Sequence, residues 1–348
     1  MRPSADALLA WYDRHHRELP WRVGPVARRG GVAPDPYRVW LSEVMLQQTT
    51  VAAVIGYFDT FITRWPTVSA LAAADDADVM AAWAGLGYYA RARNLLKCAR
   101  VVTHEFGGRF PVTEQELKAL PGIGPYTAAA IAAIAFDAPA VVVDGNVERV
   151  MARIFAETAP LPKAKSLLKA HAATLTPETR PGDYAQAAMD LGATVCTPRR
   201  PACGICPWHE GCAGRALGIA ETLPTKAPRR AKPVRFGHVW CAFSPHGIVT
   251  RRRPESGLLG GMLALPSSDW SEVPDPAPPF PSSWQAAGEV RHTFTHFHLR
   301  LTVHCATITS GRAVMSVDAA EEAMPTVFAK ALRLARGWHA NLAVTPGG

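Results

Sequence analysis

The sequence predicts a protein of two domains, an all-α body followed by a smaller α+β domain, joined by a short basic linker. Apolar residues recur at helical spacing up to about residue 220, proline and positive charge then concentrate over 222–235, and beyond that apolar and polar residues alternate. With 348 residues, the chain is too long for one ordinary domain. We therefore place the helical body at 1–221, the linker at 222–235 and the second domain at 236–345.

The helical body is rich in alanine, and its helices are expected to be short. Breakers at 64–66, 107–108 and 176–177 interrupt the helical pattern. Two further helical patterns, 113–119 and 126–136, flank a turn rich in glycine and proline. Apolar spacing also predicts one helix through Leu41, Val44, Met45, Gln48 and Ala52, and another through Leu95, Leu96, Ala99 and Val102.

The second domain shows strand periodicity. Residues 297–305 alternate between apolar and polar side chains, which predicts a strand with one buried face. Segments 239–243 and 247–250 predict a hairpin, the Pro-rich segment 266–283 a loop, and 325–336 a helix. An α+β domain of about a hundred residues is therefore expected.

The overall charge favours a polyanionic partner. Lysine and arginine outnumber aspartate and glutamate by 37 to 29, which gives a net charge of +8. Each basic side chain placed on a phosphate releases a counterion, so such an excess suits a nucleic-acid partner. A basic enzyme without that partner would carry the same charge, and the charge alone leaves both interpretations open.

The sequence shows no sign of export or membrane insertion. Charged and histidine side chains follow the apolar residues 7–11 at once, which leaves no room for a signal core. The longest apolar stretch, 127–143, is interrupted by Asp137 and Pro139 and is too short to span a bilayer. We therefore expect a soluble, cytoplasmic monomer with no membrane partner, associated with the nucleoid if the source is bacterial. In a reducing compartment its 7 cysteines are not a disulfide framework.

The turn at 120–124 is a candidate DNA contact. Gly122 and Gly124 permit backbone conformations barred to other residues and let a phosphate approach bare amides, at the start of a helix whose dipole favours an anion. An ordinary connection between helices would use the same residues. Asp144 follows an apolar run and precedes another helix, where most aspartates are only N-caps. Because a cap fixes the direction of the carboxylate, a catalytic role is compatible with it.

The cysteines fall into two groups. The motif C-x6-C-x2-C-x5-C comprises Cys196, Cys203, Cys206 and Cys212. Four thiolates suit either tetrahedral zinc or a [4Fe–4S] cluster, although zinc ribbons usually present two C-x2-C pairs and this motif has one. We expect Cys98, Cys241 and Cys305 to be small buried apolar residues.

Together these motifs resemble the endonuclease III superfamily of DNA glycosylases, in which a helix-hairpin-helix loop leads to a key aspartate. The cysteine spacing matches the cluster loop of that superfamily, so the resemblance implies a [4Fe–4S] cluster at 196–212. Segments 39–49 and 85–94 look like the adenine glycosylase motifs almost letter for letter. The likeness covers about residues 8–337. It implies an enzyme of base excision repair that removes adenine opposite 8-oxoguanine or guanine in double-stranded DNA.

The same resemblance implies the catalytic residues. Glu43 corresponds to the general acid, which needs a raised pKa because adenine leaves only after a ring nitrogen is protonated. Asp144 corresponds to the carboxylate that stabilises the cationic sugar, electrostatically or through a transient covalent bond. Asn146 would position Asp144 or water. Tyr126 stands where glycosylase/lyases carry a Schiff-base lysine, so a monofunctional hydrolase is expected. Without its flanking motif, Glu43 would be taken for a surface carboxylate on a helix.

Base removal requires the nucleotide to leave the stack. By resemblance, Gln48 fills the gap that the extruded base leaves, and Tyr88 wedges into the opposite strand. For both residues, packing in the protein core is the alternative. Arg91 and Arg93 are candidate phosphate contacts, with a solvated helix face as the alternative. The segment 22–35 is longer than in the family, and an unassigned active-site arginine falls within it.

The second domain resembles the Nudix-like recognition domain of the family through segments 256–262 and 291–298. It lacks the acidic run that holds Mg²⁺ in Nudix hydrolases, so pyrophosphate hydrolysis is not expected. A Phe-Ser-His loop reads oxidised guanine in the family. Here the corresponding residues are Phe294, Thr295 and His296, and threonine keeps the hydroxyl while adding a methyl. His292, His296 and His298 share strand parity. A metal site is nevertheless not favoured, because no acidic partner lies beside them.

Three other interpretations compete with a monofunctional adenine glycosylase. A bifunctional glycosylase/lyase would need an amine where Tyr126 stands. A Nudix hydrolase would need the missing acidic run. A non-catalytic DNA-binding module would not need Glu43 and Asp144 together.

Overall fold

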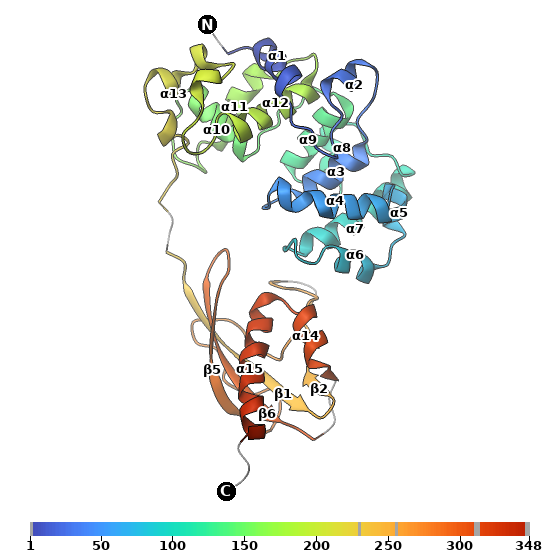
Figure 1. Ribbon diagram of the computed structural model, residues 1–348, viewed down its shortest axis with the longest axis vertical. Coiled ribbons are helices and arrows are strands. Elements are labelled where there is room, and N and C mark those ends of the chain that lie inside the picture. Colours follow the sequence, from blue (N-terminus) through green and yellow to red (C-terminus); the bar gives the residue numbers. More distant parts are fainter. Residues whose placement is uncertain (1–2, 229–230, 255–256, 310–313, 345–348) are drawn as a thin grey trace. The chain divides into compact units, whose positions relative to one another are not determined.

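The computed structural model describes residues 3–228, 231–254, 257–309 and 314–344. The chain divides into two compact units, Met1–Pro228 and Arg229–Gly348, here called the helical unit and the mixed unit (Figure 1). Within the described ranges, no helix combines the length and apolar character needed to cross a membrane. Part of the predicted linker packs on the helical unit, because Leu161 N donates to Thr225 O at 2.8 Å and Ala227 N donates to Leu161 O at 3.1 Å. Residues 229 and 230 of that linker lie outside the described residues.

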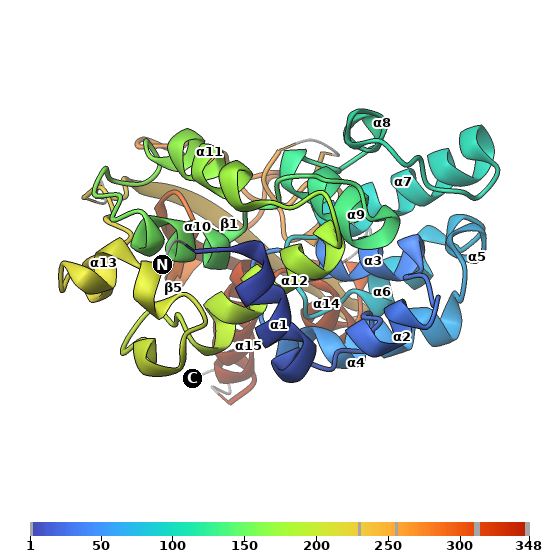
Figure 2. The same ribbon diagram turned by 90° about the horizontal axis from the view of Figure 1, so that it is seen from above.

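The helical unit is built around one central helix. Every residue of α9 (Pro125–Phe136) from Thr127 to Ile134 is buried, and the helix contacts α3, α8 and α12 (Figure 2). An alanine-rich sequence permits this position, since small side chains let neighbouring helices approach closely. The other helices of this unit are α1 Ala5–His15, α2 Pro25–Arg29, α3 Pro36–Met45, α4 Val51–Arg64, α5 Val68–Ala72, α6 Asp76–Ala82, α7 Ala90–Phe106, α8 Glu114–Ala119, α10 Gly145–Ile154, α11 Lys165–Leu175, α12 Pro181–Thr194 and α13 Ala213–Ala216.

The prediction of one helix from Leu41 to Ala52 is wrong, because this segment belongs to two helices. Helix α3 ends at Met45, and Gln48 adopts a left-handed φ of 63° that no α-helix accommodates. Thr50 then caps α4 by accepting from Ala53 N at 3.4 Å. The predicted breakers are confirmed, since α4 ends at Arg64, α7 ends before a left-handed Gly107, and α11 ends at Leu175.

The mixed unit contains a five-stranded sheet of order β5-β6-β1-β2-β7. The predicted hairpin is confirmed, because β1 and β2 pair antiparallel with Phe243 opposite Ile248. Strand β1 also runs parallel to β6, and Cys241 faces Cys305 in that register. The elements are β1 Val234–Ser244, β2 Gly247–Val249, β3 Arg251–Arg252, β4 Leu263–Ala264, β5 Gln285–Thr293, β6 His298–Thr307, β7 Val314–Met315, α14 Val317–Ala323 and α15 Thr326–Val344.

Helix α15 packs on the sheet and provides much of the core of the mixed unit. It contacts β5, β6 and β1 (Figure 1), and Phe328 and Leu332 are fully buried there with Leu301 of β6. The alternation predicted for 297–305 is confirmed, since Leu299, Leu301, Val303 and Cys305 are all buried. Residue 256, the first of a segment that carries the Nudix resemblance, lies outside the described residues.

Candidate active site and iron–sulfur loop

A cavity of about 560 Å³ in the helical unit brings the predicted catalytic residues together. Glu43 comes from α3, Tyr126 from the first turn of α9, and Asp144 and Asn146 from the start of α10. The cavity is of the size that proteins use for small organic ligands, and a nucleobase fits this class. It is therefore the candidate active site.

Glu43 is a buried carboxyl with a raised pKa. Tyr126 Oη donates a hydrogen bond to Glu43 Oε2 at 2.7 Å. Burial raises the pKa of Glu43 to about 7, and the nearby charge of Asp144 adds to the rise, while the Tyr126 hydrogen bond and Arg22 oppose it. A carboxyl with this pKa keeps about half of its protonated form at neutral pH, and a general acid must be protonated to act. The surface-carboxylate alternative is thereby excluded.

Asp144 is the N-cap of α10, as predicted. Its Oδ1 accepts from Val147 N at 2.7 Å, and its Oδ2 accepts from Asn146 Nδ2 at 2.9 Å. Burial raises the pKa of Asp144, and these hydrogen bonds oppose the rise. The cap thus fixes the carboxylate at the edge of the cavity.

Arg17 and Arg22 line the cavity, and Arg22 belongs to the segment 22–35, in which the sequence left an active-site arginine unassigned. Asp190 of α12 is fully buried and holds both of them. Its carboxylate accepts from Arg22 Nη1 at 2.8 and 2.9 Å, from Arg17 Nε at 2.6 Å and from Arg17 N at 3.0 Å. Arg22 is the one arginine of the segment 22–35 that lines the cavity in the described structure. No local motif pointed to Asp190, because its partners lie far away in the sequence.

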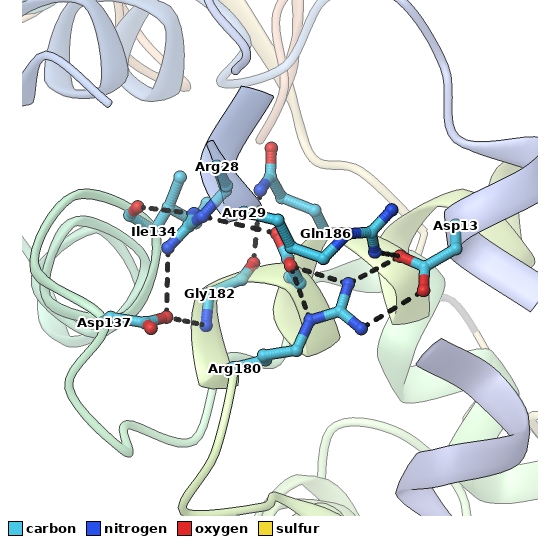
Figure 3. A network of polar contacts seen from close by, with 9 residues as sticks. Asp13, Arg28, Arg29, Ile134, Asp137, Arg180, Gly182 and Gln186 are labelled. Carbon is cyan, nitrogen blue, oxygen red and sulfur yellow. Dashed lines mark hydrogen bonds and ion pairs between the residues drawn. The ribbon is translucent and has the colours of Figure 1, made fainter. Parts of the chain in front are cut away.

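The rest of the segment 22–35 supports the cavity from outside. Arg28 of α2 donates to Asp137 Oδ1 at 3.0 Å, and the same oxygen accepts from Gly182 N at 3.0 Å (Figure 3). A Cβ at Gly182 would lie 2.3 Å from Ala133 O, so only glycine fits between α12 and α9. Gly182 O accepts from Gln186 Nε2 at 3.2 Å. Gln186 lines the cavity, and its Oε1 is buried without a hydrogen-bond partner.

Gln48 and Tyr88 both lie on turns with left-handed backbone, at φ 63° and 49°. Both side chains are exposed, so neither is a core residue. Arg91 connects the two turns: it donates to Val44 O and Met45 O at 3.0 Å and to Leu86 O at 3.1 Å. These bonds occupy much of the Arg91 guanidinium, which acts as an internal brace. Its contact with DNA stays a prediction.

The hairpin turn has the predicted form. Gly122 adopts a φ of 75°, and a Cβ there would lie 2.7 Å from Asn94 Cβ. Gly124 is the N-cap residue of α9 and has no side chain to occupy the free amides of the first turn. Those amides remain available to an anion.

The four motif cysteines line one cavity beside α10 and α12, together with Arg153. Among the described residues, no three His, Cys, Asp or Glu side chains converge closely enough for a single metal ion. Four thiolates that line a shared cavity are the ligand set of an iron–sulfur cluster. Arg153 is buried and donates to Cys196 Sγ at 3.2 Å, which places a cation beside one of the four motif sulfurs. The expected burial of Cys98, Cys241 and Cys305 is confirmed.

Hydrogen bonds lead from this loop to the active site. Arg149 Nε donates to Cys196 O at 2.8 Å, and Arg149 Nη2 donates to Asn146 Oδ1 at 2.9 Å. Asn146 in turn donates to Asp144. The loop 196–212 therefore helps to fix the orientation of Asn146 and, through it, of Asp144.

In the mixed unit, Thr295 and His296 are exposed at the turn between β5 and β6, which Phe294 N closes by donating to Phe297 O at 2.9 Å. Thr295 is therefore a turn residue and not part of a strand. We call residues 294–296 the recognition loop.

Comparison with known proteins places the chain in a class. Residues 41–177 match the HhH-GPD superfamily of base excision DNA repair proteins, residues 196–212 the iron–sulfur binding domain of endonuclease III, and residues 238–334 the NUDIX domain. A thermostable thymine-DNA glycosylase superposes with a TM-score of 0.53 at 28% identity, over 61% of this chain and 95% of that one. An endonuclease III–DNA complex shares the fold at a TM-score of 0.50 and 22% identity, over 62% of this chain and 94% of that one. The fold and site thus define a base-excision DNA N-glycosylase with an iron–sulfur loop.

Curated relatives narrow the class to one family. The adenine DNA glycosylase of Rattus norvegicus is 37% identical over 85% of this chain and 69% of its own length. The adenine DNA glycosylase of Mycolicibacterium smegmatis is 44% identical over 64% of this chain and 74% of its own length. The human enzyme is 38% identical over 86% of this chain, and the alignment spans 66% of the human protein. The chain belongs to the adenine DNA glycosylase family.

Proposed function

We propose that this chain is a monofunctional glycosylase that hydrolyses the N-glycosidic bond of adenine opposite 8-oxoguanine or guanine in duplex DNA. The observation that carries the proposal is the pair of carboxyls in one cavity, with the pKa of Glu43 raised to about 7 and Asp144 held by its cap. The reaction needs one acid and one stabilising carboxylate, and different surroundings give the two groups different roles.

In the proposed reaction, Glu43 donates its proton to a ring nitrogen of the extruded adenine. The bond between the sugar C1′ and the base then breaks, and its electron pair leaves with the neutral base. Asp144 stabilises the positive charge on the sugar, either by charge alone or through a transient ester. Water adds to C1′ and returns a proton to Glu43, which leaves an abasic site and a recharged acid.

Tyr126 supports hydrolysis without strand cleavage. A Schiff base requires an amine, and the phenol of Tyr126 provides none. No lysine lines the cavity in the described structure. Tyr126 instead holds the Glu43 carboxyl at 2.7 Å. The free Gln186 Oε1 supports adenine as the base, because an exocyclic amino group would satisfy this buried acceptor.

The DNA contacts and the reading of the opposite base are part of the same proposal. Exposed Gln48 and Tyr88 would enter the duplex at the extruded base, and Gly122 and Gly124 would present amides to the backbone. Thr295 and His296 of the recognition loop would read oxidised guanine. Their exposure supports this role.

We further propose that the iron–sulfur site holds a cluster of the [4Fe–4S] type. Cys196, Cys203, Cys206 and Cys212 would ligate it, with one thiolate for each iron. Its contribution would be structural, since it would fix the loop from which Arg149 reaches Asn146.

Single-turnover excision tests the proposed function. The purified chain is incubated with duplexes that carry adenine opposite 8-oxoguanine, guanine or thymine. We expect excision from the first two and none from the third. Glu43→Gln should lower the rate by about a hundredfold or more, the usual scale for losing acid catalysis. A wild-type chain that removes no adenine, or removes it equally opposite thymine, would contradict the proposal.

A further inference from the structure

Residues 251–253 of the mixed unit are three consecutive arginines, here called the arginine face. Arg251 and Arg252 are exposed, and Arg253 is half-buried. None of the three forms an ion pair within the described part of the chain. The ion pairs of this unit involve other arginines, namely Arg291, Arg300, Arg333 and Arg336. The arginine face therefore carries charge that the described residues of this unit leave largely uncompensated.

The three guanidinium groups are nevertheless held in place. Each donates to a backbone carbonyl: Arg251 Nη2 to Ser267 O at 2.8 Å, Arg252 Nη1 to Gly261 O at 3.2 Å, and Arg253 Nε to Leu258 O at 3.1 Å. A guanidinium has five N–H donors, so each group keeps several for a ligand. Anchored side chains also lose less conformational entropy when they bind.

The arginine face surrounds an open cavity of about 510 Å³, which Ser268 and Asp269 also line. Among the described residues that line this cavity, three arginines and one aspartate give a net charge of +2 (3 − 1 = +2). Burial and the charge of Arg251 lower the pKa of Arg253, while Asp269 opposes this. An anion in the cavity would relieve the repulsion between the arginines.

Stacking joins the arginine face to the recognition loop. The Arg253 guanidinium lies 4.9 Å from the centre of the Trp270 ring, and Trp270 stacks on Phe294 at 5.5 Å. Phe294 immediately precedes Thr295. The two features are therefore joined through packed side chains within the mixed unit.

We propose that the arginine face binds phosphodiester groups of duplex DNA next to the base that the recognition loop reads. The inference rests on the proposed function for its partner, and on the three anchored, unpaired arginines for the site. The planar guanidinium matches the geometry of phosphate oxygens. Phosphate contacts set position and orientation, while base contacts carry sequence information. The arginine face thus fixes where the recognition loop meets the duplex.

Equilibrium binding over a salt series tests this assignment. The full chain, carrying Glu43→Gln so that adenine remains, is titrated with a duplex containing adenine opposite 8-oxoguanine. Losing one phosphate contact should make the plot of log affinity against log salt shallower by about 0.9. We expect this for Arg252→Gln, and about twice the change when Arg251→Gln is added. Arg336→Gln is the matched control, because it removes the same charge from an arginine paired with Asp318. It should leave the slope unchanged.

Equal slopes for Arg252→Gln and Arg336→Gln would overturn the inference, even if the wild-type chain excises adenine. Failure of excision by the wild-type chain would instead count against the proposed function alone. A nucleoside triphosphate is the other source of phosphate, so its binding is measured in parallel. If the arginine variants lost triphosphate binding but kept the wild-type salt slope of DNA binding, the duplex assignment would be wrong.

Should Arg252→Gln unfold, Arg252→Lys replaces it. Because lysine keeps the charge, we then expect weaker binding to the duplex with the salt slope retained.

Discussion

Tyr126 Oη and Glu43 Oε2 lie 2.7 Å apart, and this hydrogen bond joins the residue that we propose decides the reaction type to the proposed proton donor. The phenol donates, so it stabilises the ionised form of Glu43 and lowers its pKa. Burial raises the same pKa by more, and the balance is a pKa of about 7. The activity of the site should therefore depend on pH within the physiological range.

The first prediction is the form of that dependence. As the proposed general acid, Glu43 must be protonated to act, and its pKa is raised to about 7. Single-turnover excision should therefore be maximal below pH 7 and decline as the pH rises through that value. Rates measured across a pH series, at constant ionic strength, give the midpoint. A rate that rises with pH through neutrality would show that Glu43 is not the acid.

The second prediction concerns Tyr126→Phe. Removing the donor destabilises the Glu43 carboxylate, so the pKa of Glu43 should rise and the alkaline midpoint should move up by about one pH unit. Tyr37→Phe is the matched control, since Tyr37 donates to Trp65 O at 2.8 Å away from the cavity. The control should lose stability without moving the midpoint. A midpoint that is the same in all three proteins would show that the hydrogen bond does not control the acid.

The third prediction concerns strand cleavage. Because Tyr126 cannot form a Schiff base, borohydride should not trap the enzyme on DNA, and breaks should appear only after alkali or heat. Tyr126→Lys places an amine in the cavity and is the positive control for trapping. Efficient trapping of the wild-type chain during turnover would mean that the reaction class is wrong.

The fourth prediction concerns the iron–sulfur loop. The purified protein should be yellow-brown and contain iron and sulfide, and Cys203→Ser should lose both. Cys98→Ser is the control, since Cys98 is buried elsewhere in the helical unit. We also expect Cys203→Ser to slow excision, because Arg149 connects the loop to Asn146. Stoichiometric zinc without iron would refute the cluster.

The sequence predicted the parts of the site that lie in local motifs. Glu43, Asp144 and the cysteines each sit within a short run that specifies both conformation and chemistry. Asp190 and Arg22 are 168 residues apart, and their contact depends on how α12 packs, which no local pattern encodes. Gln48 was misplaced in a helix for a related reason. Its apolar neighbours keep helical spacing, while its left-handed φ of 63° belongs to a turn that Arg91 braces from another helix.

The last prediction concerns how the opposite base is recognised. Thr295 is exposed on a turn, so Thr295→Ala should fold normally and lose only a contact with DNA. A hydrogen-bonded base contact is worth about 1–3 kcal/mol, or roughly ten- to a hundredfold in preference. Excision opposite 8-oxoguanine should therefore fall more than excision opposite guanine.

Thr293→Ala is the matched control for this test. Thr293 ends β5, and its Oγ1 is hydrogen-bonded to His298 Nδ1 at 2.9 Å, so the substitution removes a threonine hydroxyl that the protein itself uses. If Thr293→Ala destabilises the strand, excision opposite 8-oxoguanine and excision opposite guanine should fall equally. The measurement is single-turnover excision from both mispairs by the wild type and the two variants. If Thr295→Ala left the ratio between the mispairs at the wild-type value, the hydroxyl would have no part in reading the lesion, and discrimination would have to come from the helical unit.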